Sequence, residues 1–216
     1  MLREESLEEI TDGKRYGLND MVRADAGGCR GCSKCCETMA DTIILNPQDL
    51  MRLSHRLGYT FDELLGKGYV KVDLKDGVIL PVIGTSATGA CAFLKEGRCG
   101  IYERRPDICR LFPLGRLYEG DSFSYVLQTG QCDRPRSKVK VSKWLGIKDE
   151  EKDSAFILKW HNVLKTARGA AYADEATHRV MAMKLLEDFY RKPYEVEEKF
   201  YDEFELRAEE FLKWFT

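Results

Sequence analysis

Histidine is the metal-binding residue type that this sequence has least of. Only three are present among 216 residues, His55, His161 and His178, and they are scattered along the chain. We interpret each as a surface or packing residue rather than as a ligand. No histidine stands near a cysteine in the sequence, so a thiol–imidazole nucleophile is not supported.

Two nucleotide-related motifs are also missing. The sequence has no Gly-x-Gly-x-x-Gly, which leaves a dinucleotide-binding fold unsupported, and no Cys-x3-Cys-x2-Cys of the radical enzymes that use S-adenosylmethionine. Residues 84–89 have the two-glycine frame of a phosphate-binding loop, but Ala90 stands where the lysine belongs. We therefore expect an ordinary flexible loop at that position.

Neither sign of charge dominates, and long apolar runs are lacking. Lys plus Arg number 34 against 36 Asp plus Glu, a formal charge of -2. With no bulk basic field, we expect no nucleic acid partner. No apolar run approaches the roughly 20 residues that cross a bilayer, and the first residues are acidic where an export signal would be basic. We expect a cytoplasmic protein with no membrane partner.

Cysteine, by contrast, is abundant, with eight residues in the chain. A reducing compartment keeps thiols from pairing, and the chain is larger than the short secreted scaffolds that depend on disulfides. The adjacent residues Cys35 and Cys36 would also be awkward partners for each other in a bridge. Metal binding is therefore the leading interpretation of the thiols, with a disulfide framework as the minor alternative.

Half of the cysteines form one compact motif. Three follow one another at two-residue gaps and a fourth is adjacent to the third, in Cys29-Arg30-Gly31-Cys32-Ser33-Lys34-Cys35-Cys36. This spacing lets a tight backbone turn bring thiolates around one metal while peptide N–H groups point at sulfur. Cys35 and Cys36, as neighbours, point in different directions, so they serve two adjacent metals unless one of them is a buried structural thiol.

The other four cysteines are spread over a longer stretch. Cys91, Cys99, Cys109 and Cys132 are separated by 7, 9 and 22 residues, and such gaps alone are weak evidence for a site. Eight ligands make two four-thiolate sites, and two zinc ions, one zinc with one 4Fe-4S cluster, or a joined cluster all satisfy this count. The candidate cations that would offset thiolate charge are Arg98, Arg104, Arg105 and Arg110.

Capping residues predict short helices around the second cysteine group. Asn46 before Pro47 is typical of a helix start, and the Thr60-x-x-Glu63 spacing is a capping box that predicts another helix. Pro106 is placed to open a helical turn that presents Cys109 inward.

The remaining elements of this part are predicted from periodicity and turn residues. We expect a helix at residues 2–10, a loop at 23–28 and a short strand at 42–45. Hairpins are expected at residues 69–83 and 115–128.

Beyond residue 136, glycine and strand formers thin out and helical periodicity continues to the C-terminus. Two helices there carry aromatic-rich stripes and residues 180–190 supply a third helix; the stripe residues are Phe156, Ile157, Trp160, Val163, Leu164, Phe200, Phe204, Ala208, Phe211 and Phe215. We interpret the stripes as helix packing rather than as a cofactor or partner groove. The predicted fold class is α+β: a small cysteine-rich metal-binding core with short hairpins and helices at residues 20–135, then a helical C-terminal portion at residues 140–216 packed on it.

Several residue runs together resemble a known family. They are Cys29-x2-Cys32-x2-Cys35-Cys36, Leu45-x3-Asp49-x2-Arg52-Leu53, Cys91-Ala92-Phe93-Leu94-x4-Cys99-Gly100-Ile101-Tyr102-x2-Arg105-Pro106-x2-Cys109-Arg110-x-Phe112-Pro113 and Cys132. This pattern is similar to the YkgJ-type CxxCxxCC cysteine-cluster family, described as a zinc- or iron-chelating domain. The resemblance covers about half of the chain and implies that all eight cysteines are metal ligands.

Three functions are compatible with this reading. The leading hypothesis is a metal-binding protein, with zinc or iron as the cofactor, whose biochemical activity the sequence does not assign. The family also includes flagellin lysine N-methylases, so an iron–sulfur-dependent protein lysine N-methyltransferase is the alternative, which requires S-adenosylmethionine and a protein substrate. A second alternative is a thiol-based redox or metal sensor that releases its metal on oxidation.

Overall fold

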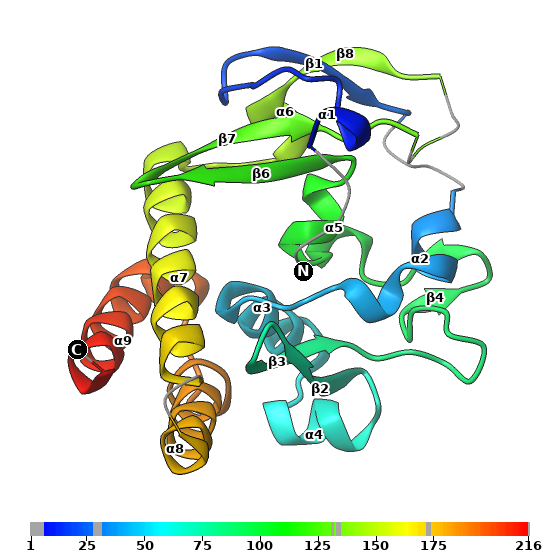
Figure 1. The fold of residues 1–216 in the computed structure, drawn as a ribbon. Coiled ribbons are helices and arrows are strands. Elements are labelled where there is room, and N and C mark those ends of the chain that lie inside the picture. The colour runs from blue at the N-terminus through cyan, green and yellow to red at the C-terminus, as the bar shows by residue number, and fades with distance from the viewer. Residues whose placement is uncertain (1–6, 28–31, 131, 133–134, 172–173, 216) are drawn as a thin grey trace.

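The computed structural model describes residues 7–27, 32–130, 132, 135–171 and 174–215. It confirms the α+β fold class, with short antiparallel strand pairs and helices followed by a helical C-terminal portion (Figure 1). Among the described residues the strands form four separate two-stranded sheets. No helix in these ranges is long and apolar enough to span a bilayer.

Short elements make up the chain before residue 130. They are α1 (Leu7–Ile10), β1 (Met21–Asp25), α2 (Lys34–Thr38), the 3-10 helix η1 (Ala40–Thr42), α3 (Pro47–Leu57), α4 (Phe61–Gly66), β2 (Val70–Lys75), β3 (Val78–Ile83), β4 (Leu94–Lys95), β5 (Arg98–Cys99), the 3-10 helix η2 (Tyr102–Arg104), α5 (Asp107–Leu111), β6 (Leu114–Glu119) and β7 (Ser122–Leu127).

Longer helices dominate the rest. After β8 (Ser137–Lys140) and α6 (Val141–Leu145) come α7 (Glu150–Ala171), α8 (Glu175–Leu186), the π-helix η3 (Glu187–Arg191), the 3-10 helix η4 (Glu197–Lys199) and α9 (Phe200–Phe215). In Figure 1, α7, α8 and α9 pack together on one side of the molecule, and α2 with β4 lies on the opposite side.

The locally encoded predictions are confirmed. Asn46 and Thr60 each accept a hydrogen bond from the backbone three residues on and complete capping boxes at the starts of α3 and α4. The two predicted hairpins are the pairs β2–β3 and β6–β7, both in regular antiparallel register. Of the helix predicted at residues 2–10, the described part is α1.

One strand prediction and one loop prediction were wrong. Residues 42–45 form no strand, because Ile43 N–H turns back to Ala40 O and closes η1, leaving an isolated bridge between Ile44 and Val82. Within the predicted loop at 23–28, residues up to Asp25 belong to β1, which pairs with β8 from the part expected to be helical. Residue 28 lies outside the described residues. β1 forms because Val22 and Ala24 alternate inward and are fully buried.

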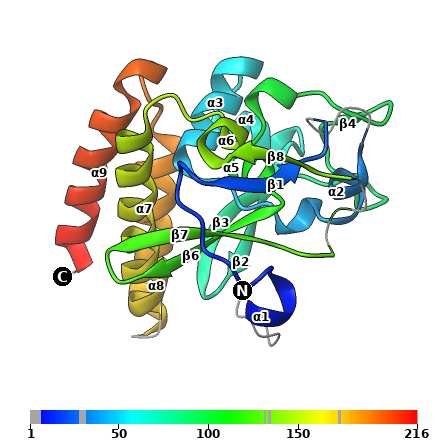
Figure 2. The same ribbon diagram turned by 90° about the horizontal axis from the view of Figure 1, so that it is seen from above.

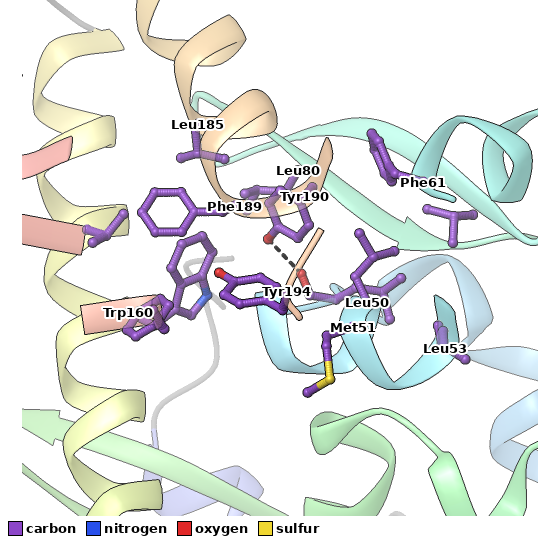
Figure 3. Packing of buried hydrophobic residues seen from close by; sticks show 14 of the residues in the cluster. Leu50, Met51, Leu53, Phe61, Leu80, Trp160, Leu185, Phe189, Tyr190 and Tyr194 are labelled. Atoms are coloured by element: carbon purple, nitrogen blue, oxygen red, sulfur yellow. Dashed lines mark hydrogen bonds between the residues drawn. The ribbon is translucent and has the colours of Figure 1, made fainter. Parts of the chain in front are cut away.

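The main core joins the segments before and after residue 136. Side chains of α3, α4, β2 and β3 pack with the aromatic stripes of α7, η3 and α9 in one buried cluster. Figure 3 shows Trp160 and Phe189 near α7, with Tyr190 and Tyr194 between them and Leu50, and the Tyr190 hydroxyl donates to Leu45 O at 2.8 Å. The aromatic stripes are therefore core, as predicted.

A second, smaller core lies under the strand pairs β1–β8 and β6–β7, which Figure 2 shows from above. It contains Val22, Leu111, Leu114, Val141 and Leu145, among others. Leu111 is the last residue of α5, so this second core fixes one end of the helix that carries Cys109.

Candidate metal centre

Four of the described cysteines lie on short helices and strands. Cys35 and Cys36 are on α2, Cys99 ends β5 and Cys109 is on α5. Cys91 forms an isolated bridge with Thr85. Each of these side chains is partly buried, as are those of Cys32 and Cys132, and no disulfide joins any two of these seven residues. Cys29, the remaining predicted ligand, lies outside the described residues.

Two distant segments, residues 32–36 and 91–99, bring their thiols near one another around Cys36. The N–H of Cys91 donates to Cys36 O at 2.7 Å, which joins the loop after β3 to helix α2. Burial, together with the smaller effects of the Cys91, Cys99, Cys35 and Cys32 charges, raises the pKa of the Cys36 thiol to about 12. Since such effects act only between near neighbours, five of the eight cysteines form one group.

The thiol of Cys91 lies next to backbone amides. Burial raises its pKa and the Cys99 thiol adds to that, whereas the backbone amides of Phe93 and Leu94 lower it; the Leu94 N–H donates to Cys91 O at 2.9 Å. Peptide N–H groups that point at sulfur favour the thiolate, and they tune thiolate–metal sites in the same way. The run Cys91-Ala92-Phe93-Leu94 is thus folded as a thiolate-supporting turn.

Cys109 joins the same group from helix α5. Burial raises the pKa of its thiol well above the ordinary value, and the charges of Asp49, Cys36, Cys91 and Cys99 all act in the same direction. Pro106 is the N-cap of α5, so the helix begins at Asp107, one residue after the predicted start. The short helix still carries Cys109 toward the other thiols.

A buried network of carboxylates and guanidinium groups positions this helix. Asp49, 2% exposed, completes the capping box of α3 and also accepts the N–H of Asp107 at 2.8 Å, so the N-termini of α3 and α5 share one carboxylate. Asp107 in turn accepts two hydrogen bonds from Arg116 on β6, at 2.5 and 3.0 Å. Arg110 lies 3.6 Å from the same carboxylate.

The protonation of this network follows from its contacts. Burial alone would raise the pKa of Asp107, but the charge and hydrogen bonds of Arg116 lower it, and Asp107 correspondingly raises the pKa of Arg116. Both groups are therefore ionised. Burial raises the pKa of Asp49, and the charge of Asp107 adds to that. A buried, bidentate ion pair of this kind is costly to break from one side, because the remaining charge has no solvent.

The sequence reasoning missed the role of these three residues. Asp49 was quoted in the family pattern without a physical reason for being there, Asp107 fell at an unspecified position of that pattern, and Arg116 was not singled out. The Asn46-x-x-Asp49 spacing of a capping box was a usable signal for Asp49. For Arg116 the signal was a cation in the middle of a predicted hairpin strand.

The candidate cations mostly contact groups other than sulfur. Arg104 donates to Glu197 at 2.7 Å, and Arg110 contacts Asp107 and donates to Leu145 O at 3.5 Å. Arg105 lies over the ring of Tyr102, 4.5 Å from its centroid. Their offsetting effect on thiolate charge therefore stays a prediction.

Histidine plays the packing role that the sequence predicted, at least at His161. Its ring stacks on Tyr118 with centroids 3.9 Å apart, on the face of α7 that meets β6. The imidazole is therefore engaged in packing.

The sulfur donors have the chemistry that a thiophilic metal requires. The positions of those that the structure describes, however, do not form a closed coordination shell. Cys36, Cys91, Cys99 and Cys109 form one electrostatic group, and all are soft sulfur donors of the kind that zinc and iron–sulfur clusters take. Within the described ranges, no group of three or more His, Cys, Asp or Glu side chains has the spacing of a metal site. Cys29 was not part of that set, and closing a shell requires sulfurs to move together.

Comparison with known proteins agrees with this chemistry. Residues 28–133 match the family model CxxCxxCC, described as a "putative zinc- or iron-chelating domain". The match begins one residue before Cys29 and ends one residue after Cys132, so it spans all eight cysteines. No solved structure matches the chain.

Proposed function

We propose that this chain, whose residues 28–133 match the CxxCxxCC family model, binds zinc or iron through its eight cysteine thiols. The observation that carries the proposal is the convergence of Cys36, Cys91, Cys99 and Cys109, which come from three separate segments of chain. Surrounding structure holds these segments: the Cys91–Cys36 backbone hydrogen bond on one side and the Asp49–Asp107 contact on the other.

A bound metal would lower the energy of the thiolate forms of this group. Without metal the raised pKa values keep Cys36, Cys91 and Cys109 protonated, so their crowding costs little. Thiolates at the same positions would repel one another, and a divalent cation or cluster removes that repulsion. Cys29, Cys32, Cys35 and Cys132 complete the proposed ligand set.

The direct test is anaerobic purification followed by metal analysis and a visible spectrum. We expect zinc or iron bound in stoichiometric amounts, and chelation should lower the free energy of unfolding by about 10 kcal/mol if the site is structural. A colourless zinc protein without iron would exclude a cluster-dependent methyl transfer, whereas a brown protein would favour the iron–sulfur hypothesis.

Variants separate metal binding from folding. Cys36→Ser and Cys109→Ser should each lose most of the bound metal, because each removes one thiol from the converged group. Thr38→Ala, on the same helix as Cys36, is the matched control and should keep its metal. Full metal content in both cysteine variants, with folding intact by circular dichroism, would refute the proposal.

A further inference from the structure

A groove beside the cysteine-bearing segments has features of a ligand site that the metal chemistry does not use. Its volume is about 480 Å³, and among the described residues its lining is Asp25, Gly27, Tyr102, Arg105, Val139, Lys143 and Trp144. The groove lies between the end of β1, strand β8, helix α6 and the η2 turn. The η2 turn stands between Cys99 and Cys109 in the chain.

The aromatic residues of the groove are held in place. Trp144 and Val139 pack against the second core from outside, and the Trp144 indole N–H donates to Leu111 O at 3.3 Å. Tyr102 is 41% exposed, and the guanidinium group of Arg105 lies over its ring. Both rings line the same groove, so they offer aromatic surface against which a planar ligand can stack.

The charged residues favour an anion. Arg105 and Lys143 form no ion pair with a carboxylate in the described part of the chain. Of the residues of the described lining, Asp25 alone is acidic, so two cations face one carboxylate. A guanidinium and an ammonium group at the edge of a stacking surface match a planar ring that carries an anionic group.

We propose that this groove binds a nucleoside monophosphate as a free small molecule. The base stacks against the aromatic lining that Tyr102 and Trp144 provide, and Arg105 and Lys143 bind the phosphate. The base and the phosphate thereby each meet groups of matching chemistry. The proposal rests on the groove and is independent of the proposed metal binding.

The test is titration of the full chain with AMP, adenosine, inorganic phosphate and a 5′-phosphorylated single-stranded oligonucleotide, by calorimetry and tryptophan fluorescence. We expect saturable AMP binding, at least tenfold tighter than adenosine or phosphate alone, because only AMP carries both halves. Trp144→Phe should remove the fluorescence change, which assigns the signal among the three tryptophans.

Charge variants decide which residues bind the phosphate. Arg105→Gln and Lys143→Gln should each weaken AMP binding about tenfold, the loss expected for one charge-assisted contact. Lys148→Gln, an exposed lysine just beyond α6, should leave it unchanged. Lys143 is exposed, so its variant should fold even where Arg105→Gln does not.

Four results would overturn the proposal. They are no saturable AMP binding, phosphate binding as tightly as AMP, AMP affinity unchanged in Lys143→Gln, and an oligonucleotide affinity far above that of AMP. The last result would identify single-stranded nucleic acid in place of a free nucleotide.

Discussion

Helices α5 and α9 bury very different side chains. Over 16 residues, α9 buries Phe200, Phe204, Ala208 and Phe211, with Arg207 capping backbone carbonyls of the η3 region. Over five residues, α5 buries Asp107 and Leu111, and its only long-range anchors in the described chain are polar contacts and one apolar residue. Apolar packing therefore holds α9, whereas α5 is held by hydrogen bonds and ion pairs together with the single apolar contact of Leu111.

This difference suits the two tasks. A converged thiol group must let sulfurs approach a metal over short distances, and an aromatic interior that is packed to crystal-like density resists such movement. Short elements tied by directional contacts keep their orientation while leaving the thiols partly exposed. The long helices supply the rigid support, because their core also includes α3, whose N-terminus binds α5 through Asp49.

The largest expected effect tests the apolar half of this comparison. Phe204 is 1% exposed and its ring lies 4.7 Å from that of Phe156. Phe204→Ala should lower the free energy of unfolding by about 4 kcal/mol, by lost burial and the cavity left behind. Urea denaturation measures the change, and metal content of the folded variant should stay at the wild-type value.

The control for this variant is on the same helix. Leu206 is 64% exposed, so Leu206→Ala should change stability by no more than about 0.5 kcal/mol. Loss of metal from folded Phe204→Ala would show that the aromatic core and the thiol group are not separable, and the comparison would fail.

The polar half is tested at Asp107. Asp107→Asn leaves Arg116 buried without its counter-charge, and we expect a loss of about 3 kcal/mol in the metal-free protein. Because the amide also weakens the anchor of α5, metal affinity should fall in competition with a chromophoric chelator. Asp121→Asn, at the exposed turn between β6 and β7, is the matched control and should change neither quantity.

A double variant distinguishes positioning from general damage. Asp107→Asn combined with Arg116→Gln removes both charges, so stability should recover part of the single-variant loss. Metal affinity should stay low, since the paired geometry that orients α5 is still missing. Full recovery of metal affinity together with stability would mean that the ion pair acts on folding alone.

The sequence predicted what is encoded locally. Asn46 and Thr60 cap their helices through residues three positions away, and Asp76-Gly77 supplies the positive φ angles that the β2–β3 turn requires, so neighbours alone decide these elements. The pairing of β1 with β8 depends on residues more than a hundred positions apart. No local signal marks that partner, and Val22 and Ala24 gave too short a pattern to reveal it.

For the candidate site, too, the sequence predicted only what individual residues and their spacing indicate. Cysteine spacing identified the candidate ligands because the chemistry of the residue type is itself the signal. The Asp49–Asp107–Arg116 network could not be predicted this way, because charged residues are mostly exposed and nothing local marks three of them as buried partners. The eight-cysteine ligand set and the boundaries at residues 20–135 and 140–216 stay predictions.

The thiol region alone should show a proton linkage to metal binding. Burial raises the pKa of Cys36 to about 12 and also raises those of Cys91 and Cys109. A metal binds thiolates, so each of these thiols must lose a proton on binding, and protons compete with the metal at every pH below the raised pKa. Metal affinity should therefore rise with pH, by about tenfold per unit for each thiol deprotonated.

The pH range separates these thiols from ordinary ones. An ordinary thiol has a pKa of about 8.5, so its contribution to the slope ends near that pH. In the folded protein, the slope of zinc affinity should continue to at least about pH 10, as measured by chelator competition corrected for the chelator's own protonation. The chain unfolded in denaturant is the comparison, and its slope should level off near the ordinary value. A folded-state slope that also levels off there would mean that the thiols are not buried together, because shared burial is what holds their protons at alkaline pH.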